Sequence, residues 1–225
     1  MTHTFLDISK AVLNLIFPVY CQGCGEPLGY DNDLFLCRKC LEKLTPFSDG
    51  YCPADNVYPF LEKTCHCCIY DGLVRELIHK FKYEKKLFLK RAFVQLLHGL
   101  FAAKMADKGI ETIISVPMLG PDERVRGFNQ SEILAKGLSK KTDIAYKNAL
   151  KKNFATNAQA GLRRAQRLTN VKDAFSCRKQ IDIRDKRVMI IDDVFTTGST
   201  INECAKALKT GGSGAVFAMT LARGI

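Results

Sequence analysis

Four cysteines near the start of the chain have the spacing of metal ligands. Cys21 and Cys24 form one pair with two residues between them, and Cys37 and Cys40 form a second pair after twelve further residues. Each pair predicts a knuckle, a tight turn on which two thiolates converge, and Gly23 gives the first turn conformational freedom. Four convergent thiolates suit a tetrahedral Zn²⁺ in a closed structural site. This spacing favours zinc over an iron–sulfur cluster or metal-free buried cysteines.

A second set of residues repeats this register with one sulfur missing. Its members are Cys52, Asp55, Cys65 and Cys68, and the aspartate stands where a second knuckle would have a cysteine. Asp55 or His66 would complete a mixed metal site, since zinc also accepts oxygen and nitrogen ligands. The alternative interpretation is that these thiols pack as small apolar groups. The sequence leaves both open.

The stretch that best suits phosphate chemistry follows the apolar run 188–191. It begins with two carboxylates, Asp192 and Asp193, and continues into a loop of Thr196, Thr197, Gly198, Ser199 and Thr200. Backbone N–H groups and hydroxyls of such a loop bind phosphate where a helix begins. The paired carboxylates would accept hydrogen bonds from vicinal sugar hydroxyls. A 5-phosphorylated ribose meets both requirements, whereas the simpler alternative is a helix-capping loop beside two solvated aspartates.

A second block of anion-binding residue types follows the short apolar run 112–116. It contains Arg124, Arg126, Gly127, Asn129 and Gln130. Guanidinium groups bind pyrophosphate with two parallel hydrogen bonds, and the amides can hydrogen-bond a ribose or a base. We therefore predict a loop that binds pyrophosphate or substrate, with stabilisation of a turn by Arg126 and Asn129 as the alternative.

Positive charge is concentrated in the later part of the chain. The net charge is +11, yet residues 1–70 hold 5 Lys and Arg against 8 Asp and Glu. Residues 147–187 hold twelve basic residues against three acidic ones. Such a segment follows nucleic-acid phosphates, covers a phosphorylated ligand or is simply solvated. We predict binding of single-stranded DNA through 147–187 and 80–91, on Arg163, Arg164, Arg167, Lys80, Lys82, Lys85 and Lys86.

Helices and strands alternate in the part of the chain that must position these groups. Apolar residues recur at helical spacing over 73–81, 87–105, 130–138 and 201–208. Short apolar runs that predict buried strands lie at 112–116, 188–191 and 215–221. This alternation predicts an α/β fold with a mostly parallel, Rossmann-type sheet covered on both faces. Ligands of such sheets gather beyond the carboxyl ends of the strands, where the two phosphate-binding segments would meet.

Residues 190–200 resemble the loop that binds phosphoribosyl pyrophosphate (PRPP) in type I phosphoribosyltransferases. They consist of two hydrophobic residues followed by Asp-Asp-Val-Phe-Thr-Thr-Gly-Ser-Thr. Three further features make the chain similar to the ComF/GntX family of competence-associated proteins. They are the four cysteines, the block Arg-Val-Arg-Gly-Phe-Asn-Gln at 124–130, and the spacing of Gln, Gly, Leu, Arg, Asn and apolar residues over 159–175. The similarity covers nearly the whole chain. It implies a zinc module with a short amphipathic start at 1–70, and a phosphoribosyltransferase-like PRPP-binding domain at 71–225.

The resemblance implies a role in natural transformation, in which the protein handles incoming single-stranded DNA with partners from the DNA-uptake machinery. It implies Zn²⁺ as structural cofactor and PRPP with Mg²⁺ as ligand. Residues 118–123 lack the His and extra Arg that relatives place there. An active phosphoribosyltransferase that releases pyrophosphate is therefore the alternative function, and an interaction adaptor is a third. The sequence shows no signal peptide or membrane-length apolar run, which predicts a cytoplasmic protein or one peripheral at the inner membrane.

Overall fold

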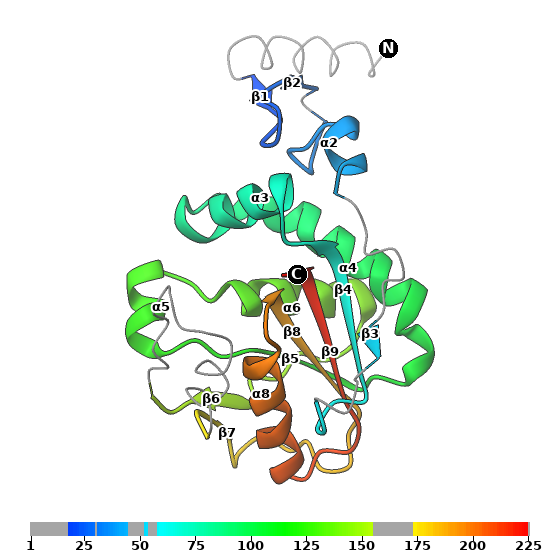
Figure 1. The fold of residues 1–225 in the computed structure, drawn as a ribbon, viewed down its shortest axis with the longest axis vertical. Helices are drawn as coiled ribbons and strands as arrows, with labels where there is room; N and C mark the ends of the chain where they lie inside the picture. The colour runs from blue at the N-terminus through cyan, green and yellow to red at the C-terminus, as the bar shows by residue number, and fades with distance from the viewer. Residues whose placement is uncertain (1–17, 30, 45–51, 54–57, 155–172, 225) are drawn as a thin grey trace, which may run out of the picture.

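A five-stranded sheet forms the centre of the protein (Figure 1). The computed structural model describes residues 18–29, 31–44, 52–53, 58–154 and 173–224. The strands stand in the order β3 (Cys52–Pro53), β4 (Lys63–Ile69), β9 (Val216–Arg223), β8 (Val188–Phe195) and β5 (Thr112–Ser115). Neighbouring strands from β4 to β5 run parallel, while β3 pairs with β4 in the antiparallel sense. The predicted α/β fold with a mostly parallel sheet is confirmed.

Helices cover both faces of this sheet. One face carries α3 (Gly72–Tyr83), α4 (Lys90–Lys104) and α6 (Gln130–Thr142), and the other carries α8 (Ser199–Thr210). Strand β8 shows the reason, because Met189 and Ile191 join the core under the first three helices while Val188 and Ile190 join the core under α8. Successive side chains of a strand point to opposite faces, so a continuous apolar run is buried on both sides.

Shorter elements connect these layers. One 3₁₀ turn, Leu87–Leu89, leads into α4, and another, Ala106–Lys108, follows it. The helix α5 (Gly120–Arg126) occupies the segment after β5 that the sequence predicted as a loop. An antiparallel pair, β6 (Leu150–Lys152) and β7 (Phe175–Cys177), packs beside α8. None of the helices within the described residues has the length and apolar character needed to cross a bilayer.

The N-terminal cysteines belong to a small unit beside α3 (Figure 1). It contains a short ladder of β1 (Val19–Tyr20) and β2 (Pro27–Leu28), followed by the helix α2 (Arg38–Glu42). We call the described residues between 18 and 44 the cysteine module. Its Leu36 and Cys40 are buried in the same core as Leu77 and Phe81 of α3. The module is therefore packed onto the larger fold through α3.

The predicted domain boundary between residues 70 and 71 needs correction. Strand β4 lies inside the central sheet, paired along its length with β9. Five consecutive residues of β4, 64–68, are buried. Their Thr-Cys-His-Cys-Cys sequence reads as part of a cysteine-rich module, but thiols are apolar enough to occupy a strand that is covered on both faces. The sheet therefore begins before residue 70, at β3.

Candidate functional site

The four predicted metal ligands converge in the cysteine module. The sulfurs of Cys21, Cys24, Cys37 and Cys40 all lie within 4.8 Å of one another. Sγ of Cys24 and Sγ of Cys37 are 3.7 Å apart. In a tetrahedral Zn²⁺ site with Zn–S bonds of about 2.3 Å, the sulfurs would stand about 3.8 Å apart. The cluster thus has the donor set and the size for a metal such as zinc.

Backbone hydrogen bonds favour the thiolate form at part of this cluster. The N–H of Cys37 donates to Sγ of Cys21 at 3.2 Å, and the N–H of Cys40 donates to Sγ of Cys37 at 3.4 Å. Burial raises the pKa of Cys21, but backbone hydrogen bonds from Cys37, Cys24 and Gly23 outweigh it and lower that pKa to about 6. Burial and the neighbouring thiols raise the pKa of Cys40. Four thiolates so close together require a cation, which a divalent metal supplies.

The proposed second metal set is not assembled on β4. Cys65 and Cys68 are three residues apart on this strand, so their side chains leave it in opposite directions and cannot form a knuckle. Both are buried and pack as small apolar groups. Asp55 and the side chain of Cys52 lie outside the described residues. His66, on the same strand, is kept neutral because burial lowers its pKa to about 3.

The two predicted carboxylates stand at the carboxyl end of β8. Asp193 is 4% exposed, and its Oδ2 forms an ion pair with Nζ of Lys82 from α3 at 2.7 Å. Burial alone would lower the pKa of Lys82, but the charge and hydrogen bond of Asp193, together with the charge of Asp192, more than offset this and raise it. The pair is therefore held charged inside the protein, and breaking either half leaves an uncompensated buried charge.

Asp192 has a different environment. Its Oδ1 accepts hydrogen bonds from the hydroxyl of Ser131 at 2.6 Å and from the N–H of Asp193 at 2.9 Å. Burial, followed by the negative charge of Asp193, raises the pKa of Asp192 to about 7 despite these hydrogen bonds. Asp192 therefore titrates near neutral pH.

The loop after β8 is shaped by Gly198, which has a left-handed backbone (φ 73°) and opens α8. A Cβ at this position would come within 3.0 Å of the rings of Tyr58 and Phe195, so the position requires glycine. The hydroxyl of Tyr58 donates to the carbonyl of Thr197 at 2.8 Å. The Thr197 and Ser199 hydroxyls are 2.8 Å apart. The N-cap residue Gly198 has no side chain to cap α8, and the N–H of Ser199 makes only a long hydrogen bond of 3.5 Å to the Thr197 hydroxyl, so the N–H groups of this first turn are suited to an anion.

The block 124–130 forms the end of α5 and the start of α6. The side chain of Asn129 caps α6, accepting from the N–H groups of Ser131 and Glu132 and donating to the carbonyl of Val116. The guanidinium of Arg126 donates to Gln130 Oε1 at 2.8 Å. Asn129 thus has a structural role: it fixes the helix start that places Ser131 against the acid pair. Arg124 is exposed, and Gly127 ends α5 with φ 88°.

Comparison with known proteins assigns the chain to a family. Residues 118–224 match the model of the phosphoribosyl transferase domain. Over 212 residues the chain is 32% identical to Competence protein F of Haemophilus influenzae, covering 92% of this chain and 85% of that protein. The chain belongs to the ComF family. It is also 30% identical over 207 residues to the DNA utilization protein YhgH of Escherichia coli strain K12, covering 90% of this chain and 83% of YhgH.

A structural match is also found to an allosteric regulatory enzyme of purine biosynthesis, at a TM-score of 0.41 and 21% identity. It covers 59% of this ComF-family chain and 26% of the enzyme's chain. The chain thus spans about a quarter of that enzyme, and the family assignment rests on the sequence relatives and the domain match alone.

Two of the lysines predicted to bind DNA are turned inward in this ComF-family protein. Nζ of Lys80 donates to the carbonyl of Gln22 at 2.7 Å, and Lys82 pairs with Asp193. Both lie on α3 beside the fully buried Phe81, where long side chains bury their stems against the core. Lys85 is exposed and Lys86 is half-buried. The predicted arginines Arg163, Arg164 and Arg167 lie outside the described residues.

The last turn of α3 thereby contacts three parts of this ComF-family protein: the cysteine module, the acid pair and Arg126. Lys80 holds the first knuckle through Gln22, and Lys82 holds the acid pair. The Tyr83 ring lies under the guanidinium of Arg126, 5.2 Å from ring centroid to Cζ. Sequence reasoning missed Lys82, Ser131 and Tyr58 as members of the site. A serine two residues after the Asn of a helix start was the one available signal, whereas Tyr58 carries none.

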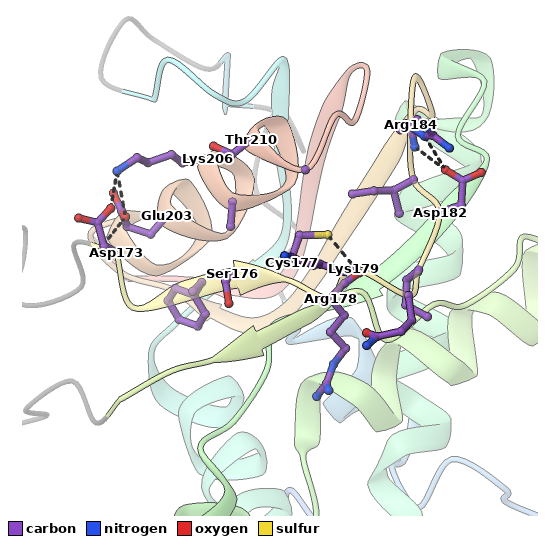
Figure 2. A pocket seen from close by; sticks show the side chains of 16 residues that line it. Asp173, Ser176, Cys177, Arg178, Lys179, Asp182, Arg184, Glu203, Lys206 and Thr210 are labelled. Carbon is purple, nitrogen blue, oxygen red and sulfur yellow. Dashed lines mark hydrogen bonds and ion pairs between the residues drawn. The ribbon is translucent and has the colours of Figure 1, made fainter.

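A separate hollow of about 620 Å³ lies between α8 and the segment 173–184 (Figure 2). It follows α8 from Glu203 onward and so lies past the start of that helix. Among its charged side chains, Lys206 pairs with Asp173 at 2.7 Å and Arg184 pairs with Asp182 at 3.6 Å. This hollow is therefore not part of the acid-pair site.

Proposed function

We propose that this ComF-family protein binds a 5-phosphoribosyl ligand of the PRPP class at the carboxyl end of β8 and handles incoming single-stranded DNA during natural transformation. The family membership and the phosphoribosyl transferase domain support a role in competence or DNA utilization. The finer statement depends on the geometry of the site.

One observation carries the ligand assignment: a single short segment holds two carboxylates near the end of β8 and then the start of a helix whose N-cap is glycine. The loop 196–200 offers N–H groups and hydroxyls to a 5-phosphate, as helix starts do for anions in general. Asp192 and Asp193 precede this loop by two residues, Val194 and Phe195, and would accept hydrogen bonds from ribose hydroxyls. The pyrophosphate would extend toward Arg124 and Arg126, whose guanidinium groups match its geometry.

Mg²⁺ would enter this site with its ligand. Within the described part of the chain, the four module cysteines are the group whose donor atoms can enclose a metal ion. At the acid pair, the ligand would therefore have to supply most of the oxygens around Mg²⁺. Hard oxygen ligands suit Mg²⁺, and pyrophosphate oxygens with one or two carboxylates provide them. The ion would neutralise the pyrophosphate when bound, while Asp192 and Asp193 contribute oxygens from the protein.

Isothermal titration calorimetry with PRPP and Mg²⁺ tests the assignment. The variant Asp192→Asn with Asp193→Asn removes two charged hydrogen-bond acceptors and should weaken binding by roughly 100-fold or more. Asp173→Asn with Asp182→Asn, two exposed acids beside the other hollow, is the matched control and should leave affinity unchanged. Circular dichroism confirms that each variant is folded at the temperature used. Wild-type affinity in the site variant would refute the assignment.

Transfer of the phosphoribosyl group is a second candidate, and the environment of Asp192 favours it. A carboxyl group with a pKa of about 7 can accept a proton from a nitrogen nucleophile at neutral pH. Incubation with PRPP, Mg²⁺ and a panel of nitrogen acceptors distinguishes the two functions. Pyrophosphate release that depends on one acceptor supports transfer, whereas binding without release supports a ligand-binding role.

A further inference from the structure

A groove runs between α4 and α6 at the edge of the cysteine module. It has a volume of about 630 Å³. Its floor is apolar, with Leu34, Val94, Ile133 and Gly137 among its lining residues. A Cβ at Gly137 would come within 3.0 Å of Val94, so glycine lets the two helices approach closely here. The groove is formed by packed helices and is therefore a fixed feature of the fold.

The rim of this groove is strongly cationic. Five basic side chains line it against one acid, Asp33: Lys90, Arg91, Lys136, Lys140 and Lys141. Arg91 pairs with Asp33 at 2.5 Å, and Lys136 pairs with a glutamate of its own helix at 2.7 Å. Lys90, Lys140 and Lys141 are exposed, and among the described residues none of the three has an acidic partner. Three uncompensated positive charges thus face one hollow.

The charges at the start of α4 oppose what helix stability alone would favour. A helix N-terminus carries partial positive charge and is stabilised by acidic residues in its first turn. The first turn of α4 has no acidic residue and no capping side chain, and instead carries Lys90 and Arg91. An anion in the groove would offset this repulsion. It would also be held by Lys140 and Lys141 from the last turn of α6.

We infer that this groove binds the backbone of single-stranded DNA, with its phosphates on the cationic rim and its bases toward the apolar floor. The inference deepens the proposed role in DNA handling and rests on it. A nucleic-acid strand combines regularly spaced negative charges with flat apolar faces, which matches a charged rim around an apolar floor better than a purely charged polymer does.

The groove is distinct from the phosphoribosyl site. Ser131, at the start of α6, contacts Asp192, whereas Lys140 lies nine residues further along the same helix, about 14 Å away. It also differs from the DNA-binding segments predicted from the sequence, apart from Lys90 and Arg91 at the end of one of them. One helix, α6, would therefore carry a ligand at each end.

Fluorescence anisotropy with a labelled oligo-dT of about 20 nucleotides, longer than a typical single binding unit, tests this groove. The variant Lys140→Glu with Lys141→Glu should weaken binding at least tenfold at low salt. It should also flatten the slope of log affinity against log salt by about 1.4, which is 0.7 for each lost phosphate contact. The milder Lys140→Gln with Lys141→Gln should give a smaller loss in the same direction. The control Arg75→Glu with Lys104→Glu makes the same change in net charge on exposed helix positions outside the groove.

The outcomes distinguish a wrong groove assignment from a wrong proposal of DNA handling. Equal losses in groove and control variants would overturn the groove assignment while leaving DNA handling intact. Absence of binding by the wild-type protein at low salt would overturn both. Displacement of oligo-dT by polyglutamate of equal charge would show that the groove selects charge alone and would refute its assignment to nucleic acid. Unchanged PRPP affinity in the groove variants would support two independent sites.

Discussion

The cysteine module and the acid-pair site are assembled over very different distances along the chain. All four sulfurs of the cluster come from the twenty residues between Cys21 and Cys40. The acid-pair site combines Tyr58, Lys82 and Ser131 with the end of β8, and these segments meet only after the whole sheet has formed. A local spacing is therefore enough to predict the first site, whereas the second requires the tertiary fold.

The two regions are nevertheless connected by a single turn of helix. Lys80 of α3 bonds the first knuckle, and Lys82, half a turn later, pairs with Asp193. The module also buries Leu36 and Cys40 against this helix. Loss of the metal should therefore alter the acid pair. Variants in either region can test this connection.

The largest effect should follow from removing one metal ligand. Cys37→Ser should lower the metal content from about one equivalent to a small fraction, because binding to a four-thiolate site contributes on the order of 10 kcal/mol. Elemental analysis of purified protein measures this directly. Cys177→Ser is the control, since that cysteine lies on β7, away from the cluster, and should retain full metal content. Full metal content in Cys37→Ser would rule out the four-cysteine site.

The same Cys37→Ser protein tests the connection through α3. Its affinity for PRPP should fall about tenfold, within the range typical of coupling between sites. Lys80→Ala, which removes the bond to the knuckle but leaves the cysteines intact, should produce part of this loss. Unchanged affinity in both variants would show that the module and the acid pair are independent.

A smaller but still large effect is expected at the buried ion pair. Lys82→Met leaves Asp193 charged and unpaired, which should cost about 3–5 kcal/mol in the free energy of unfolding. Lys82→Met combined with Asp193→Leu removes both charges and should recover most of the loss. Urea denaturation of the three proteins gives the comparison. If the single variant were as stable as the double one, the pair would not be buried and charged as described.

Prediction from sequence succeeded where the chemistry and the spacing are local. The two cysteine pairs and the alternation that gives the parallel sheet were both predictable. It failed where a residue type has two uses. Lys82 was assigned to a DNA surface because lysines are usually exposed, yet its long stem lets it reach a buried carboxylate. The sequence left open whether Cys65 and Cys68 bind a metal or pack as small apolar groups, because thiols do both, and the strand buries them.

An effect of comparable size, spread over about three pH units, concerns the pH dependence of stability at Asp192. Its pKa is about 7 in the folded protein and near 4 in the unfolded chain, so the folded state binds the extra proton between these values. This contribution to stability is present below about pH 4 and is lost as the pH rises toward 7, by up to about 1.4 kcal/mol per pH unit. Asp192→Asn should therefore gain stability relative to wild type as the pH rises, levelling off above 7. Parallel unfolding curves across pH 4–8 would contradict the assignment.

The smallest effect is expected from the hydroxyl of Tyr58. Tyr58→Phe removes its hydrogen bond to the carbonyl of Thr197 but keeps the ring against Gly198. One neutral hydrogen bond contributes about 1 kcal/mol, which corresponds to a roughly fivefold loss of PRPP affinity if it is used to hold the loop. Tyr70→Phe, on a half-buried tyrosine after β4, is the control. Calorimetry should show the loss in affinity with no matching change in melting temperature. A hydrogen bond that served only the fold would instead lower the melting temperature and leave binding by the folded protein unchanged. The reverse pattern would place Tyr58 with the core of the sheet and leave the loop to be held by Gly198 and the start of α8 alone.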